Sequence, residues 1–86
     1  MPTVLRVDGF RVVIYAPPRE HPPPHVHVFV DGGEVEVGIP VAGGDPPVRR
    51  AVGVRDAVAW KACRLVAQHS EFLFSMWRQL HDARFR

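Results

Sequence analysis

The stretch HVHVFVDGGEVEVGI, residues 25–39, decides the fold because its hydrophobic pattern fits one secondary structure. Polar and apolar residues alternate strictly on both sides of the turn residues, as they do in strands with one buried face. Asp-Gly and Gly-Gly are both favoured two-residue turns between antiparallel strands. The sequence therefore predicts a β-hairpin whose turn is either Asp31-Gly32 or Gly32-Gly33.

The two faces of this hairpin carry different side chains in either register. The apolar face, which we expect to cover the core, holds Val26, Val28, Val30, Val35 and Val37. The other face holds His25, His27, Phe29, Glu34 and Glu36. An Asp31-Gly32 turn places His27 opposite Glu36 and Phe29 opposite Glu34, whereas the alternative turn places Phe29 opposite Glu36.

The segments before and after this hairpin complete the predicted sheet. Residues 3–15 read as two strands, TVLRV and FRVVIY, joined at Asp8-Gly9. The segment 16–24, APPREHPPP, contains five prolines and is predicted to be a rigid loop. Residues 41–53 are predicted to be a loop, within which 46–53 fit either a brief edge strand or the start of a helix.

Helical spacing begins at residue 54. The apolar stripe consists of Val54, Val58, Ala62, Leu65, Val66, His69, Leu73, Met76, Trp77 and Leu80. One straight helix of this length would measure ~45 Å, which exceeds the width of so small a domain. We therefore expect two helices, the first capped near Asp56, with a break near Ser70. Trp60 and Trp77 are predicted to lie in the core, and His69 to be a core or capping histidine.

These segments predict one α+β domain over residues 1–86. It has two layers: a four-stranded antiparallel sheet of two hairpins in residues 1–40, and two C-terminal helices in 54–84 packed on one face. The single cysteine, Cys63, excludes an internal disulfide and fits a reducing compartment. No stretch approaches the ~18 apolar residues of a membrane span, and MPTVLRVDG lacks a leader pattern. We expect a cytoplasmic protein without a membrane partner.

The histidines around the proline run form the candidate site. His25 and His27 are two residues apart, so in a strand they point the same way with Cβ atoms ~7 Å apart. With His21 they are candidate ligands for a divalent metal such as zinc. Alternatively, His25 or His27 acts as a general acid or base and Glu36 orients it. A third alternative is a solvated strand face, where a His-Glu pair adds only ~0.2–1 kcal/mol.

Basic residues gather in the second half of the chain. Residues 1–43 carry three Arg against five acidic residues, while residues 44–86 carry eight Lys and Arg against four. This asymmetry favours a nucleic-acid or acidic-partner surface on the second half, or merely a solvated helix face. The candidate binding residues are Arg49, Arg50, Arg55 and Arg64.

The chain also resembles a family of small bacterial proteins, domain of unknown function family 4160. The resemblance lies in Met-Pro at the start, a Gly in the first turn, a Tyr closing the second strand and a His-x-Pro-Pro-His-x-His motif. The matching positions are Met1, Pro2, Gly9, Tyr15, His21, Pro23, Pro24, His25 and His27, together with His69, Leu73 and Trp77 in HSEFLFSMW. The resemblance implies a gene layout similar to that of toxin-antitoxin modules.

The expected function is therefore a regulatory component of toxin-antitoxin type. It would bind a small protein partner or nucleic acid through its basic helical half and use the histidine cluster as a ligand site. Alternatives are an RNA-cleaving toxin, with Arg49 or Arg50 stabilising phosphate charge, and a metal-binding domain. Whether the chain is an enzyme stays open, and an exposed edge strand would also allow a homodimer.

Overall fold

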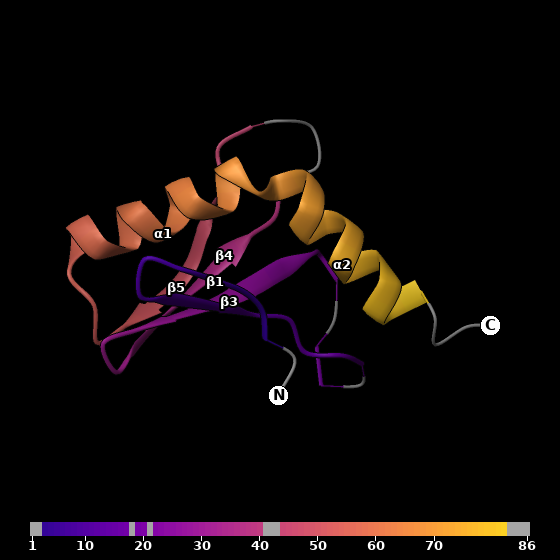
Figure 1. Cartoon of the computed structure of the whole chain (residues 1–86), viewed down its shortest axis with the longest axis horizontal. Coiled ribbons are helices and arrows are strands. Elements are labelled where there is room, and N and C mark those ends of the chain that lie inside the picture. The colour runs from indigo at the N-terminus through magenta and orange to yellow at the C-terminus, as the bar shows by residue number, and fades with distance from the viewer. Residues whose placement is uncertain (1–2, 18, 21, 41–43, 83–86) are drawn as a thin grey trace.

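The sheet and the two helices form an α+β arrangement in which strands come first and helices second (Figure 1). The computed structural model describes residues 3–17, 19–20, 22–40 and 44–82. The elements are β1 (Thr3–Val7), β2 (Phe10–Val13), β3 (His25–Val30), β4 (Gly33–Gly38), β5 (Val48–Val52), α1 (Asp56–Gln68) and α2 (Ser70–Asp82). All strand pairs are antiparallel and the strand order is β1-β2-β3-β4-β5, so each strand pairs with its neighbour in sequence.

Both predicted hairpin turns are confirmed. Asp8 and Gly9 have φ angles of 49° and 83°, and Asp31 and Gly32 have 47° and 80°. Positive φ at both central residues defines the type I′ turn, which suits the twist of paired strands. The Asp31-Gly32 turn fixes the register of β3 and β4, with His27 opposite Glu36.

The prediction of four strands is wrong, because β5 adds a fifth strand beside β4. This strand lies within residues 46–53, for which the sequence left open a brief edge strand or the start of a helix, and the edge strand is the alternative found. Residues 41–43 of the predicted loop are outside the described part. Every residue of VRRAV is exposed, so the strand has no alternating hydrophobic signal. Its position depends on main-chain pairing, including a hydrogen bond from the N–H of Gly38 to the carbonyl of Pro47.

The predicted break between two helices is confirmed, one residue before Ser70. His69 ends α1: its backbone N–H and its Nδ1 both donate to the carbonyl of Leu65. The largest dimension of the fold is 40 Å, shorter than a continuous helix would require. The start of α1 differs slightly from expectation, since Arg55 is the N-cap residue and Asp56 lies in the first turn.

The valine face of the sheet packs against both helices, as predicted. The buried core cluster consists of Val12, Ile14, Val26, Val28, Val35, Val37, Ile39, Ala62, Leu65, Val66, Leu73 and Trp77. Trp77 is 4% exposed, but Trp60 is 58% exposed, so the prediction of a core position is wrong for Trp60. Trp60 lies on the face of α1 opposite to the one on which Ala62, Leu65 and Val66 are buried.

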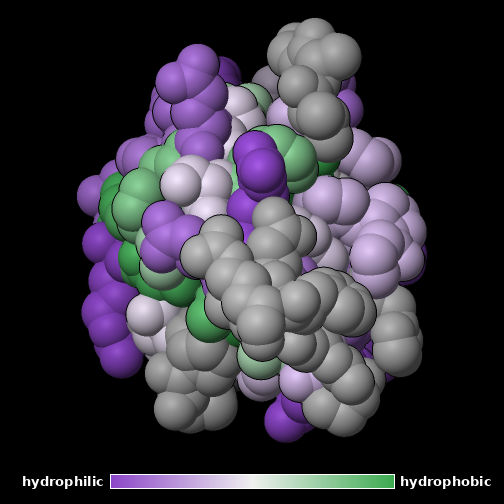
Figure 2. Space-filling model, turned by 90° about the vertical axis from the view of Figure 1, so that its right-hand side faces the viewer, coloured by the Kyte–Doolittle hydropathy of each residue, from purple (hydrophilic) through white to green (hydrophobic). Residues whose placement is uncertain are grey.

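The end of the molecule near the close of α2 exposes hydrophilic and hydrophobic groups side by side (Figure 2). No helix in the described residues has both the length and the apolar character needed to cross a bilayer.

Candidate functional site

His25 and His27 are buried, although they lie on the polar face of the hairpin. Their exposed fractions are 4% and 8%. The ring of Trp77, from α2, lies 5.3 Å from the ring of His25, and Glu20 of the loop between β2 and β3 contacts both histidines. In Figure 1 this loop lies next to α2. The alternative of a solvated strand face is therefore wrong for these two residues.

Hydrogen bonds orient the ring of His25. Its Nδ1 lies 2.9 Å from the carbonyl oxygen of Pro23. A carbonyl only accepts, so Nδ1 donates and carries the hydrogen. The Nε2 atom lies 2.9 Å from Oε2 of Glu20. The proline run thus presents a fixed acceptor that turns Nε2 toward the carboxylate.

Two carboxylates orient the ring of His27, with Nε2 again facing Glu20. Its Nδ1 donates to Oε2 of Glu34 at 2.6 Å, and its Nε2 lies 2.5 Å from Oε1 of Glu20. The edge of the ring also meets Tyr15, with ring centroids 5.0 Å apart. Both Nε2 atoms therefore converge on the carboxylate of Glu20.

This arrangement is a group of side chains able to hold a metal ion. One ligand atom from each of Glu20, His25 and His27 lies within 4.8 Å of the others. Two imidazole nitrogens and one carboxylate oxygen suit zinc, manganese and ferrous iron. Metal-binding histidines usually donate the other ring N–H to a carbonyl or carboxylate, as Pro23 and Glu34 accept here.

The charge state of Glu20 is set by these histidines. Burial raises the pKa of its carboxyl group. Hydrogen bonds from His25 and His27, together with their positive charge, lower this pKa by more than burial raises it. The net effect is a pKa below the ordinary value of 4.5. Glu20 is therefore an ionised carboxylate near neutral pH.

A pH-dependent stability follows from the depressed pKa of Glu20. The carboxylate stabilises the fold above the unfolded-state pKa of about 4.5, and this contribution is lost as the pH falls through the lower folded-state value. We expect metal-free wild type to exceed Glu20→Gln in urea midpoint at pH 5.5, with a smaller difference at pH 3.5. A difference that stays constant or grows toward acid pH would contradict this assignment.

The predicted partner of the histidines, Glu36, is replaced by Glu34. Glu36 lies directly opposite His27, yet its carboxylate is 3.4 Å from Nε of Arg49. Glu34 is the diagonal neighbour, two residues along β4, and diagonal pairs lie within reach of long side chains. Glu36 is therefore outside the histidine cluster. His21, the third predicted ligand, lies outside the described residues.

Sequence reasoning missed Glu20, which is the centre of the cluster. The residue lies in an irregular loop, where neither strand nor helix periodicity predicts a side-chain direction. One signal was present in the sequence: Glu20 is the sole acidic residue in APPREHPPP, residues 16–24.

The four predicted arginines come from three parts of the fold. Arg49 and Arg50 lie on β5, Arg55 precedes α1, and Arg64 lies within α1. Arg49 pairs with Glu36, and the guanidinium of Arg64 lies 5.3 Å from the centre of the Trp60 ring. The histidine cluster therefore does not include these arginines.

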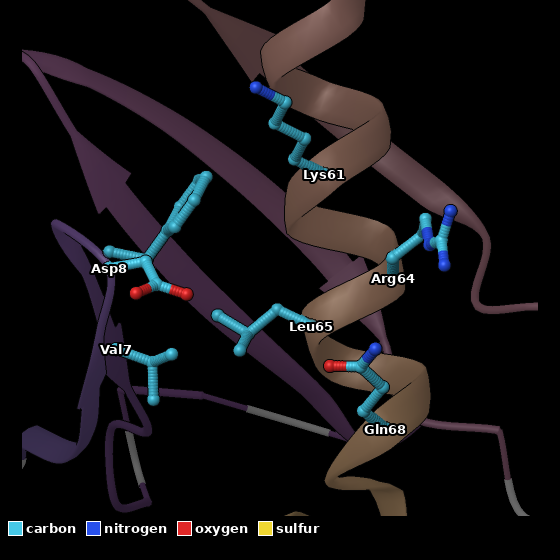
Figure 3. A pocket seen from close by; sticks show the side chains of 7 residues that line it. Val7, Asp8, Lys61, Arg64, Leu65 and Gln68 are labelled. Atoms are coloured by element: carbon cyan, nitrogen blue, oxygen red, sulfur yellow. The ribbon is translucent and has the colours of Figure 1, made fainter.

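A separate cavity of about 460 Å³ lies between the β1–β2 turn and α1 (Figure 3). Leu65 and Val7 border it, and Lys61 reaches toward it from α1. The guanidinium of Arg64 points away from Asp8 and Val7. This cavity shares no lining residue with the histidine cluster.

A family model matches most of the chain. The family model described as Domain of unknown function (DUF4160) matches residues 9–78, a span that contains Glu20, His25, His27 and Glu34. No curated protein and no solved structure matches the chain. Since the match covers most of the sequence, the resemblance predicted from the residues is confirmed, and the chain belongs to the family DUF4160.

Proposed function

We propose that this chain binds one divalent metal ion, with zinc as the first candidate, through Glu20, His25 and His27. The observation that carries the proposal is the convergence of both Nε2 atoms on one carboxylate, while both Nδ1 atoms face acceptors. A neutral imidazole with Nδ1 as donor presents a lone pair at Nε2. A lone pair beside a carboxylate is unfavourable unless a proton or a metal cation lies between them, so the site holds either two protonated rings or a metal ion on neutral rings.

A divalent ion satisfies the charge balance of the site as well as two ring protons do. Two ring protons, or one divalent cation on two neutral rings, supply two positive charges. Either choice neutralises the carboxylates of Glu20 and Glu34. Zinc bonds of ~2.0–2.1 Å place tetrahedral ligand atoms ~3.3 Å apart, which small side-chain movements can reach from a group within 4.8 Å.

The burial of the rings favours a binding role over RNA cleavage. A general acid or base must reach the reacting proton, and His25 and His27 expose under a tenth of their surface. We infer that the ion stabilises the fold of a regulatory component of toxin-antitoxin type. Such an ion would fix the loop carrying Glu20 against β3 and α2.

Zinc titration of tag-free, chelator-treated protein tests this proposal. We expect one zinc per chain by calorimetry, and a loss of at least ~100-fold in affinity for His27→Ala and Glu20→Gln. Glu34→Gln should weaken affinity by ~10–100-fold, because partners of ligands orient them. The matched control is His69→Ala, since His69 contacts the carbonyl of Leu65 at the end of α1.

Far-UV circular dichroism of each variant separates lost binding from lost folding. The variant His21→Ala tests whether the third histidine of the sequence motif is a further ligand. Absence of stoichiometric zinc, cobalt or manganese binding in folded wild type would overturn the proposal. Equal zinc affinity of wild type and folded His27→Ala would do the same.

A further inference from the structure

The strand β5 is an edge strand exposed along its whole length. All five of its residues are exposed, and Val48 and Val52 expose 47% and 51% of their surface. Only β4 pairs with it among the described residues. An edge strand offers a row of unpaired N–H and C=O groups, onto which another strand can add.

The two faces of β5 offer different contacts. By register, Val48 and Ala51 lie opposite valines of β4 and share the helix side of the sheet. Arg50 and Val52 lie opposite glutamates of β4 on the other side. Arg49 pairs with Glu36, whereas Arg50 has no ion-pair partner among the described residues. One side thus suits apolar residues, and the other suits a negative charge.

An apolar hollow lies close to the start of this strand. A cavity of about 270 Å³ lies between Pro46, two residues before β5, and Trp60 of α1. Trp60 is 58% exposed. An apolar hollow next to an edge strand gives a partner a place for an apolar side chain beside the strand pairing.

These features favour one occupant over two others. Full-length antiparallel pairing of two β5 strands would place Arg50 opposite Arg50 of the second copy, and like charges opposite each other are destabilising. Nucleic acid would contact the arginines but would leave the valines and the strand hydrogen-bonding groups uncovered. An extended acidic peptide with alternating apolar residues can contact the arginines, cover the valines and pair with the hydrogen-bonding groups of the strand.

We propose that β5 binds an extended segment of a partner protein, in which acidic and β-branched residues alternate, as a sixth strand of the sheet. Arg50 determines the preference for negative charge. The inference goes beyond metal binding and does not depend on it, because β5 lacks any residue of the Glu20, His25 and His27 group.

The test uses the full chain and a fluorescein-labelled peptide that alternates valine and glutamate over seven residues. Three further probes are its valine-lysine counterpart, an equally acidic peptide with alternating proline, and a single-stranded oligonucleotide. We expect saturable binding of the valine-glutamate peptide by fluorescence anisotropy. We also expect slower amide hydrogen exchange in β5 when this peptide is bound.

Charge reversal on each edge strand gives the matched variants. We expect Arg50→Glu to weaken binding of the valine-glutamate peptide at least ~10-fold and to strengthen binding of the valine-lysine peptide. Arg6→Glu makes the same charge change at an exposed position of β1, the opposite edge, and should leave both affinities unchanged.

Four results would overturn the inference. In the first, the proline-containing peptide binds as tightly as the valine-glutamate peptide; in the second, Arg6→Glu loses as much affinity for the valine-glutamate peptide as Arg50→Glu does. In the third, only binding of the oligonucleotide depends on Arg50. In the fourth, the chain forms a dimer that protects β5 from hydrogen exchange. A zinc titration run in parallel reports separately on the metal proposal.

Discussion

Replacing Trp77 by alanine is expected to lower the free energy of unfolding by about 3–5 kcal/mol, the range for truncating a buried aromatic side chain. Trp77 is 4% exposed and belongs to the core cluster. Its ring stacks on His81 with centroids 3.5 Å apart and lies 5.3 Å from the ring of His25. Truncation therefore removes core packing and the cover of the histidine cluster together.

Urea unfolding followed by circular dichroism measures this effect. Trp60→Ala is the matched control: Trp60 is exposed and contacts Arg64, so its loss should cost less than about 1 kcal/mol. If the two tryptophan variants lose similar amounts of unfolding free energy, α2 is not packed on the sheet as described. In Trp77→Ala, zinc affinity should also fall, because His25 loses its packing partner.

Replacing Gly33 by alanine is expected to destabilise the fold by about 1–3 kcal/mol or more, the cost of overpacking. A Cβ atom at Gly33 would lie 2.5 Å from Cγ1 of Val54 and 2.6 Å from the carbonyl oxygen of Gly53. The second contact is with backbone, which cannot rotate away as a side chain can. The segment between β5 and α1 would have to move.

Gly44→Ala provides the comparison for this variant. No atom lies within 4 Å of a Cβ built on Gly44, so we expect a change within about 0.5 kcal/mol in thermal or urea unfolding. Equal stability of the Gly33 and Gly44 variants would contradict the close approach of β4 to the β5–α1 connection.

Local patterns predicted the elements whose signals are local. The Asp-Gly turns and the alternation in residues 25–39 predicted two hairpins. The alternation also predicted which side chains share a face of the second hairpin, and it limited that hairpin to two possible registers. Helical spacing predicted the apolar stripe that α1 and α2 bury, and the length limit of a small domain predicted the break near Ser70. Tandem histidines on one strand predicted that His25 and His27 point to one side, where their rings lie 5.4 Å apart.

The candidate site needed contacts between distant segments. Glu20 lies in a loop without periodicity, and its place between the two rings depends on how the proline-rich segment folds over β3. The choice of Glu34 over Glu36 depends on competition from Arg49, which is located by a fifth strand that the pattern left open as an alternative to a helix start.

The sequence by itself determined the period-two strands, the turns and the apolar stripes, because each depends on the order of neighbouring residues. The tertiary structure alone decided that β5 is a strand, that Trp77 rather than Trp60 is buried, and that two polar-face histidines are covered by α2 and a loop. The physical reason is that main-chain pairing and the burial of polar groups depend on which surfaces meet. That information lies in packing between segments, not in the periodicity of any one of them.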